Sequence, residues 1–356
     1  MPDIWVLSVF VSASAAAAGG SWSTTSDTEA IRGAVQAAPL QDGRMLPIGY
    51  EYPPNTLVEI YDPSSGTWTR QPATNVPRQL YLTVVTLLDG RVLIAGGDYF
   101  GPAISSEIFD PADGSWSLTG NLNVARRDAE AVTLSDGRVL IAGGLGRLTN
   151  AELYDPATGL WTVTGDMAVA RFGHAMVGLQ DGTVLVAGGS YDIASSEVYD
   201  PSTGTWTRAG DMTDGRQRFS MTLLPDGRVF AVGDGITADL YDPTTRTWSR
   251  TASPRGAKFG STATLLPDGT VLVAGGEYVY PTSEIFDPST QTWLLTGPLI
   301  QRRKDHGALV LNDGTVLIAG GSYESPPCTP KGCTFHSLMS AEIFTPDSEQ
   351  GRISGD

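Results

Sequence analysis

Short apolar runs recur along the whole chain, and each run follows an Asp-Gly dipeptide. The runs lack polar alternation, as in Val-Leu-Ile-Ala (92–95), so they predict strands that are buried on both faces. The seven Asp-Gly dipeptides that precede these runs begin at Asp42, Asp89, Asp136, Asp181, Asp226, Asp268 and Asp313. Their spacings of 47, 47, 45, 45, 42 and 45 residues predict a repeat architecture that is built blade by blade.

Two further features recur in each copy. An acidic residue opens an apolar strand that ends in Asp-Pro, as in Glu-Val-Tyr-Asp-Pro (197–201), and a tryptophan follows the proline by five residues. Asp-Gly and Asp-Pro-x-x-Gly segments predict tight turns, because glycine accepts the positive φ that such turns need and the ring of proline fixes φ at a value that suits a turn. Each unit is therefore four short strands, a to d, and glycine and proline recur too often for helices. The tryptophans assigned to the repeat are Trp22, Trp68, Trp116, Trp161, Trp206, Trp248 and Trp293.

The two ends of the chain predict how the ring closes. The last copy ends without its tryptophan, whereas Trp22 stands 20 residues before Asp42, as Trp116 stands 20 residues before Asp136. A strand near residues 20–26 should therefore complete the final blade, which leaves no open sheet edge. We expect an all-β fold, a seven-bladed β-propeller of four-stranded blades in which the tryptophans fill the space between blades.

The pattern of paired glycines, aromatic-Asp-Pro and tryptophan resembles kelch repeats. It is similar to kelch-type propellers of secreted bacterial proteins and to the propeller domain of galactose-oxidase-like proteins, over about residues 20–350. The resemblance implies the fold. It does not select a function, since such proteins include adhesins, scaffolds and a few enzymes.

The same resemblance raises copper oxidation as an activity. The galactose-oxidase family uses two tyrosines, two histidines and a cysteine cross-linked to a tyrosine, and one tyrosine directly precedes a ligand histidine. This chain has no Tyr-His dipeptide, and its two cysteines lie in one loop. We therefore expect no metal and no cofactor.

Composition narrows the partners and the compartment. A net charge of −16 and a pI near 4.5 argue against nucleic acid and anionic membranes as partners. Residues 1–19 combine an apolar run with small residues, as a signal peptide does, and are too short for a membrane span. We expect residues 20–356 to form a single propeller, a monomer that is secreted to the extracellular space or the periplasm. The positive residues that normally begin a signal peptide are missing, so a mis-assigned start or a cytosolic protein is the alternative.

Cys328 and Cys333 lie in the one long b–c loop. A disulfide across the short turn between them is the favoured interpretation for a secreted protein. Free thiols remain an alternative. A metal site that adds His336 is another, although its spacing is not a common zinc pattern and a fourth ligand is not apparent.

A basic residue recurs ten positions before Asp-Gly, as at Arg126, and an acid recurs at the start of strand c, as at Glu152. These residues predict a ring of structural ion pairs, with a ring of ligand-facing arginines as the alternative. His174 and His306 occupy equivalent positions in two copies, which favours a structural role for rings bonded to neighbouring backbone.

The b–c loops differ between copies and carry aromatic residues. We predict a non-catalytic binding module that recognises a protein or a glycan on the face formed by the b–c and d–a loops, centred on blades 6, 7 and 1. A carbohydrate-active enzyme, mutarotase- or oxidase-like, with its site at the channel mouth is the alternative, and an adhesive module with a flat aromatic patch is a third. The candidate ligand-binding residues are Tyr50, Tyr52, Tyr278, Tyr280, Tyr323, Phe335, Arg302 and Arg303.

Overall fold

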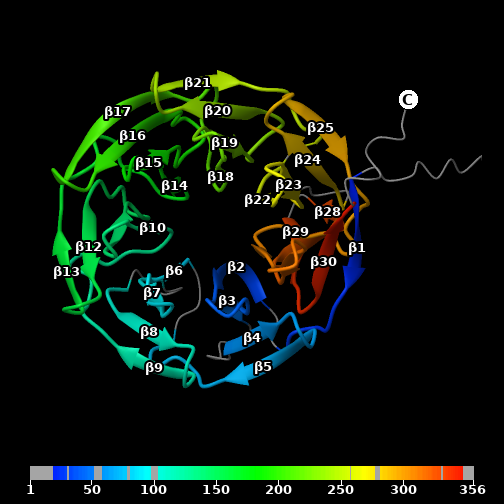
Figure 1. Cartoon of the computed structure of the whole chain (residues 1–356), viewed down its shortest axis with the longest axis horizontal. Coiled ribbons are helices and arrows are strands. Elements are labelled where there is room, and N and C mark those ends of the chain that lie inside the picture. Colours follow the sequence, from blue (N-terminus) through cyan, green and yellow to red (C-terminus); the bar gives the residue numbers. More distant parts are fainter. Residues whose placement is uncertain are drawn as a thin grey trace, which may run out of the picture.

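A computed structural model describes residues 19–29, 32–51, 58–77, 81–97, 103–256, 258–276, 281–329 and 332–347, and every structural statement below concerns these residues. Seven four-stranded antiparallel sheets stand around a central channel (Figure 1). The described part contains no helix, and so none that is long and apolar enough to cross a membrane. The fold is a seven-bladed β-propeller, as the repeat predicts.

In the first three blades the strands run in chain order from the channel to the rim. Blade 1 contains β2 (Arg32–Pro39), β3 (Met45–Glu51), β4 (Val58–Asp62) and β5 (Thr67–Gln71). Blade 2 contains β6 (Thr83–Thr86), β7 (Val92–Ala95), β8 (Ser106–Asp110) and β9 (Ser115–Leu118). Blade 3 contains β10 (Glu130–Thr133), β11 (Val139–Ala142), β12 (Ala151–Asp155) and β13 (Leu160–Val163).

Blades 4 to 6 repeat this order. Blade 4 contains β14 (Ala175–Gly178), β15 (Val184–Ala187), β16 (Ser195–Asp200) and β17 (Thr205–Asp211). Blade 5 contains β18 (Ser220–Leu223), β19 (Val229–Val232), β20 (Ala238–Asp242) and β21 (Thr247–Arg250). Blade 6 contains β22 (Thr262–Leu265), β23 (Val271–Ala274), β24 (Ser283–Asp287) and β25 (Thr292–Leu295).

Blade 7 joins the two ends of the chain. It contains β26 (Gly307–Val310), β27 (Val316–Ala319), β30 (Ala341–Pro346) and, as its outer strand, β1 (Gly20–Thr24). β1 pairs antiparallel with β30, with Trp22 opposite Phe344, and lies beside it at the rim (Figure 1). The predicted closure by the N-terminal strand is confirmed. Between β27 and β30 a separate hairpin of β28 (Ser322–Thr329) and β29 (Gly332–Ser337) forms the long b–c excursion.

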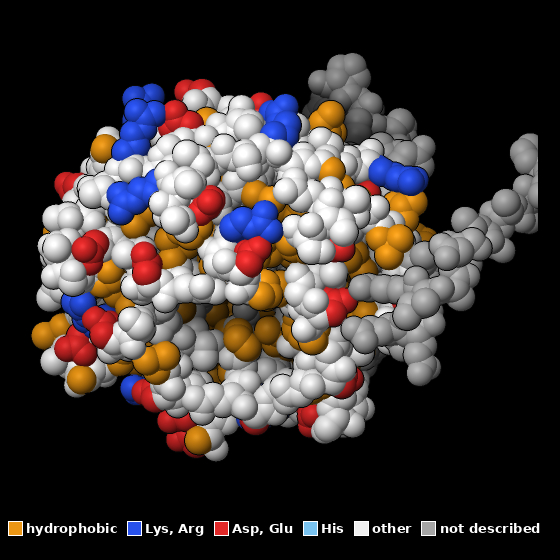
Figure 2. All heavy atoms as spheres, turned by 45° about the horizontal axis from the view of Figure 1, so that its top comes forward, with side chains coloured by type: hydrophobic (Ala, Val, Ile, Leu, Met, Phe, Trp, Pro, Cys, Tyr) orange, Lys and Arg blue, Asp and Glu red, His pale blue; other side chains and the backbone are white. Residues whose placement is uncertain are grey.

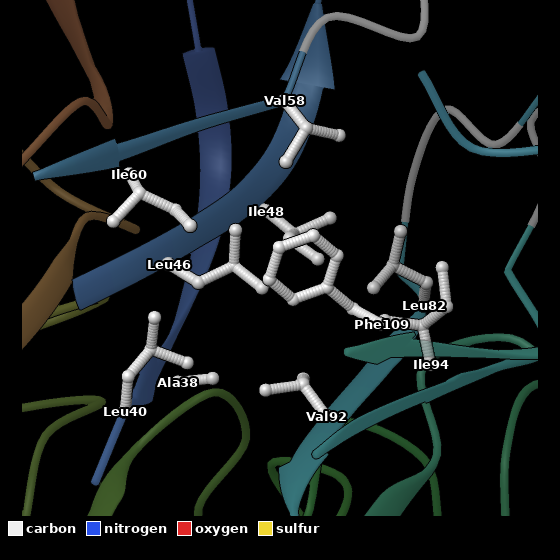
Figure 3. Packing of buried hydrophobic residues seen from close by; sticks show 10 residues of the cluster. All are labelled: Ala38, Leu40, Leu46, Ile48, Val58, Ile60, Leu82, Val92, Ile94 and Phe109. Carbon is white, nitrogen blue, oxygen red and sulfur yellow. The ribbon is translucent and has the colours of Figure 1, made fainter. Parts of the chain in front are cut away.

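Apolar side chains of neighbouring blades form the core. The b strands are buried along their length, as the absence of polar alternation predicts. Between blades 1 and 2, Leu46 and Ile48 of β3 and Phe109 of β8 belong to one cluster, and their side chains point toward one another (Figure 3). Similar clusters lie between the other blades, so each sheet is stabilised by its neighbours.

The tryptophans bridge blades in the predicted manner. Each indole packs on the aromatic residue of its own strand c, as Trp206 does on Tyr199 with ring centroids 4.9 Å apart. Each indole N–H also donates a hydrogen bond to the preceding blade, as Trp206 Nε1 does to the Gly165 carbonyl at 2.8 Å. The same bridge is made by all seven repeat tryptophans, whose other six donors are Trp22, Trp68, Trp116, Trp161, Trp248 and Trp293.

The predicted ring of structural ion pairs is confirmed in five blades. Arg126 Nη2 lies 3.0 Å from a carboxylate oxygen of Glu152, and both side chains are fully buried. The guanidinium also donates to the carbonyls of Gly143 and Asn150, which fixes the start of the b–c loop. The equivalent pairs are Arg171–Glu197, Arg216–Asp239, Lys258–Glu284 and Arg303–Glu342.

Candidate functional site

The inner ends of the blades enclose a cavity at one end of the central channel, which we call the channel mouth. Its volume is about 230 Å³, and residues from all seven blades line it. It lies where the d–a connections enter the inner strands, so it opens on the predicted recognition face and not on the side of the Asp-Gly turns. Figure 2 shows the molecule hollowed near its middle, with charged side chains of both signs scattered over the surrounding surface.

One residue of each described d–a connection contributes to the mouth at an equivalent position, eight residues before Asp-Gly. We call these six residues the mouth ring: Tyr81, Asp128, Gly173, Arg218, Gly260 and Asp305. Their φ angles lie between 51° and 69°, the left-handed region that favours glycine. Backbone hydrogen bonds join the ring from blade to blade, as from the Arg218 amide to the Gly173 carbonyl at 2.7 Å.

Arg218 is the central charge of the mouth. Its Nη2 lies 3.8 Å from Asp128 Oδ2, and its Cζ lies 4.7 Å from the centroid of the Tyr81 ring. The guanidinium of blade 5 therefore reaches across blade 4 to residues of blades 3 and 2. Gly173 lies in the blade between them, where a Cβ would lie 3.0 Å from Cγ of Gln217 and 3.4 Å from Cγ of Arg218. The ion pair with Asp128 is longer than a hydrogen bond, and the Arg218 side chain remains 33% exposed.

Three carboxyl groups line the same cavity. Glu130, the first residue of β10, is half-buried in the channel wall. Burial, followed by the negative charge of Asp128, raises the pKa of Glu130 to about 8. Burial also raises the pKa of Asp128 and of Asp305, although the positive charge of Arg218 opposes both shifts. Titratable groups perturbed in this way and gathered in one cavity are characteristic of functional sites.

The two histidines at the mouth are uncharged. His174 and His306 each follow a mouth-ring residue and are buried, and burial is the main reason that the pKa of each falls to about 3. Nε2 of His306 lies 2.9 Å from Oγ1 of Thr262. Neither ring nitrogen of His174 has a hydrogen-bond partner among the described residues. The predicted bonds to neighbouring backbone are thus wrong in detail, because a hydroxyl replaces them at His306 and nothing does at His174.

A family model identifies the type of repeat. The model of the Kelch motif matches residues 170–213, which contain the four strands of blade 4. The other six blades repeat the strand order and the Asp-Gly turn of that blade. The chain is a kelch-repeat β-propeller. A search of curated proteins found no match.

Solved structures support the same fold for this kelch propeller. One match is a fungal alcohol oxidase of the AA5 family, described as having catalytic diversity and solved in complex with copper. It superposes with a TM-score of 0.75 at 20% sequence identity, and the match covers 95% of this chain and 79% of the oxidase chain. Since 1173 chains of solved structures match, the likeness identifies an architecture shared by many proteins and does not select an activity.

The residues of this kelch propeller do not fit a copper centre of the galactose-oxidase type. Within the described part of the chain, no group of three or more His, Cys, Asp or Glu side chains is placed to hold a metal ion. His174 and His306 are buried against Gly143 and Gly275 of the preceding blades, and Gly173, not a tyrosine, precedes His174. We therefore derive no step that passes through copper.

The residues singled out from the sequence are only partly described. Tyr52, Tyr278 and Tyr280 lie outside the described residues, as do the side chains of Tyr50, Phe335, Cys328 and Cys333. The predicted signal peptide also lies outside, except for its last residue. The disulfide and the aromatic cluster of blades 6, 7 and 1 therefore stay predictions.

The described candidates separate into two groups. Arg302 lies over Tyr323, with Cζ 5.7 Å from the ring centroid, and Tyr323 stacks on His336 with centroids 4.9 Å apart. These three side chains form a stack beside the hairpin. Arg303 is 1% exposed and pairs with Glu342 at 2.6 Å, so its guanidinium is used inside blade 7.

Sequence reasoning placed the alternative enzyme site at the channel mouth but did not predict which residues line that cavity. Tyr81, Asp128, Glu130, Arg218 and Asp305 come from four different blades, and none recurs as a residue type through the repeat. The signal that could have identified these residues is variation between the copies at one position of the repeat, not recurrence of a residue type. At the position eight before Asp-Gly, the copies differ in charge and size although the backbone is the same.

Proposed function

We propose that this kelch propeller is a binding module that recognises a polar, hydroxyl-bearing ligand, a glycan, on its b–c/d–a face. The recognised group of the ligand binds in the channel mouth. The observation that carries the proposal is the convergence of Tyr81, Asp128, Arg218 and Asp305 on one cavity from four blades. Binding sites are typically concave, with a few converging polar groups.

The chemistry of the mouth favours hydroxyl groups. The Arg218 guanidinium offers only donors, and the carboxylates of Asp128 and Asp305 offer acceptors. A hydroxyl can donate and accept at once, so neighbouring hydroxyls of a sugar can bridge the two kinds of group. A cavity of about 230 Å³ is below the usual range of about 300–1,000 Å³ for whole small-molecule sites, so it takes one unit of a larger ligand.

The stack of Arg302, Tyr323 and His336 supplies a second part of the recognition face. It is close to the mouth in the chain and in space, because Lys304 Nζ, next to Asp305, lies 2.7 Å from Glu324 Oε1 of the same hairpin. Aromatic and arginine side chains are the types that dominate binding surfaces. Further units of the ligand would extend from the mouth over this stack.

Arg218→Met tests the location of the site on a glycan array. The matched control is Arg228→Met, on the opposite face, where Arg228 pairs with Asp226 in an Asp-Gly turn and is similarly exposed. The protein lacking residues 1–19 should bind a defined set of glycans. Arg218→Met should weaken that binding at least tenfold, about 1.4 kcal/mol, and Arg228→Met should leave it unchanged.

The results of this experiment test the location of the site and the class of the ligand separately. If Arg228→Met loses binding and Arg218→Met keeps it, the ligand sits on the Asp-Gly face. If both variants bind the glycans as tightly as the parent protein does, the channel mouth is not the binding site. If no glycan on the array is bound, the ligand class is rejected.

A second candidate function, an acid–base enzyme acting on carbohydrate, is favoured by Glu130. With a pKa near 8 it is protonated at neutral pH and can donate a proton, while a carboxylate such as Asp128 accepts one. Interconversion of sugar anomers needs such a pair, one group at the ring oxygen and one at the anomeric hydroxyl. The test is the rate of anomer exchange by NMR with the wild type and Glu130→Gln. Rates equal to that of buffer alone would reject catalysis while leaving binding intact.

We also propose that the protein acts outside the cytoplasm after removal of residues 1–19. The support is the composition of that segment and the spacing of the two cysteines. N-terminal sequencing of protein recovered from the culture medium or periplasm tests it. An intact Met1 on protein found only in the cytoplasm would reject it.

A further inference from the structure

Glu130 is an acid at a position where the repeat does not require one. It faces the channel mouth and also the adjoining cavity of about 250 Å³ deeper in the channel. The same position, six residues before Asp-Gly, is neutral in every other copy: Gln36, Thr83, Ala175, Ser220, Thr262 and Gly307. Among the described residues, no hydrogen bond or ion pair to the Glu130 carboxylate is found. Its charge is therefore not explained by the architecture of the blade.

The charges around Glu130 do not balance. Asp128 and Asp305 face the same cavity, and Arg218 is the cation opposite them. His174 and His306 are neutral at physiological pH. Lys304, beside Asp305, pairs with Glu324 at 2.7 Å. An anionic ligand would meet an excess of carboxylates, and a neutral ligand would leave Glu130 protonated, because no described cation pairs with its ionised form.

We infer that the ligand seated in the channel mouth carries a primary ammonium group, held by the carboxylate of Glu130 with Asp128 as a second acceptor. This inference rests on the proposed binding function and names the chemical class of the recognised unit, an amino sugar or a hydroxylated alkyl amine. A primary ammonium has three donors for neighbouring carboxylate oxygens. A quaternary ammonium fits less well, because Arg218 already covers the face of Tyr81 that would hold it.

Binding of such a group releases a proton. In the free protein burial and Asp128 keep Glu130 largely protonated at pH 7, since its pKa is about 8. The carboxylate must be ionised to pair with an ammonium group. A simple alkyl ammonium stays protonated well above pH 8, as lysine does, and the more acidic ammonium of an amino sugar is still mostly protonated at pH 7. Close to one proton per ligand should therefore pass to the buffer at pH 7.

The experiment compares two molecules that differ in a single group. Calorimetric titrations at pH 7 use 3-amino-1,2-propanediol and glycerol as the first pair, and glucosamine and glucose as the second. Each titration is repeated in two buffers of different ionisation enthalpy, which gives the number of protons released. The proteins are the wild type, Glu130→Gln, Asp128→Asn and, as the control, Asp166→Asn, whose exposed carboxylate lies outside the mouth.

The amine of each pair should bind the wild type at least tenfold more tightly than its neutral partner, with release of about one proton. Glu130→Gln should lose both the preference and the proton release, and Asp128→Asn should weaken the preference. Asp166→Asn should keep both. A preference for glucosamine alone would identify an amino sugar, and a preference in both pairs would identify the ammonium group as sufficient.

Equal binding of amine and neutral partner in both pairs, no proton release, or an amine preference that survives in Glu130→Gln would each overturn the inference. Thermal melting of every variant identifies one that fails to fold, and Asp128→Asn then gives the independent result. Neutral glycans that bind in an Arg218-dependent manner would leave the proposed function standing while this inference fails. If there is neither an amine preference that depends on Glu130 nor glycan binding that depends on Arg218, the channel mouth is rejected as a binding site.

Discussion

Four blades carry a tyrosine at the same position of strand c, and only three of the four hydroxyls are bonded. Tyr199 lies 2.7 Å from Oγ1 of Thr164, three residues after the tryptophan of the preceding blade. Tyr61 and Tyr154 make the same contact with a threonine. At the equivalent position before Tyr241 the chain has Ala209, and the buried Tyr241 hydroxyl has no partner among the described residues.

Removing the hydroxyl should therefore have opposite effects at two equivalent sites. Tyr199→Phe should lower the free energy of unfolding by about 1 kcal/mol, the usual net value of a neutral hydrogen bond. Tyr241→Phe should leave it unchanged or raise it by up to about 1 kcal/mol, because it deletes a buried polar group that gains nothing from burial. Both rings are fully buried, and each packs on its tryptophan at about the same distance, so the apolar contribution cancels in the comparison.

Urea unfolding of the wild type and both variants measures the difference. The midpoints should move in opposite directions, or Tyr241→Phe should not move at all, with the dependence on urea unchanged. Equal losses in the two variants would refute the reasoning, since they would mean that the Tyr241 hydroxyl has a bonding partner. A changed urea dependence would mean that the variant alters more than the hydroxyl.

Three further predictions concern ring closure, acid stability and the hairpin. Deletion of residues 1–28 removes β1 and should lower the melting temperature and increase aggregation relative to the chain lacking residues 1–19; equal melting would contradict closure by that strand. His174 binds its proton with a pKa of about 3 when folded and about 6.5 when unfolded, so stability should fall as pH decreases from 6.5 toward 3, and His174→Gln should show a shallower fall. Cys328 and Cys333 should form a disulfide in secreted protein, seen as a gain of two hydrogen atoms in intact mass on reduction; free thiols before reduction would reject it.

The fold could be predicted because each copy of the repeat encodes its own turns and strands. Asp-Gly and Asp-Pro-x-x-Gly define the turns locally, and the uninterrupted apolar run of the b strand predicts burial between blades. The closure of the ring by the N-terminal strand could also be predicted, since Trp22 stands as far before Asp42 in the sequence as Trp116 stands before Asp136. The buried ion pairs followed from the same regularity.

The site could not be predicted in this way, because it depends on the ring and not on the repeat. Asp128 and Arg218 are 90 residues apart in the sequence, and the closed ring brings them to 3.8 Å. The Arg218 guanidinium also lies over the ring of Tyr81, three blades away in the ring. The pKa of Glu130 depends on burial by surrounding blades, which no local pattern reports. A comparison of the same position between copies would have pointed to these residues without giving their geometry.

The backbone of the mouth ring links this variation to function. The ring has a left-handed residue in six blades, and Gly173 and Gly260 adopt that conformation without strain. Tyr81, Asp128 and Arg218 adopt the same conformation although a left-handed backbone costs a residue with a Cβ about 1–2 kcal/mol. Glycine in two copies shows that the blade itself does not need those side chains. Strained residues that persist in this way cluster at functional sites, so we propose that the copies that depart from glycine are the ones whose side chains bind the ligand.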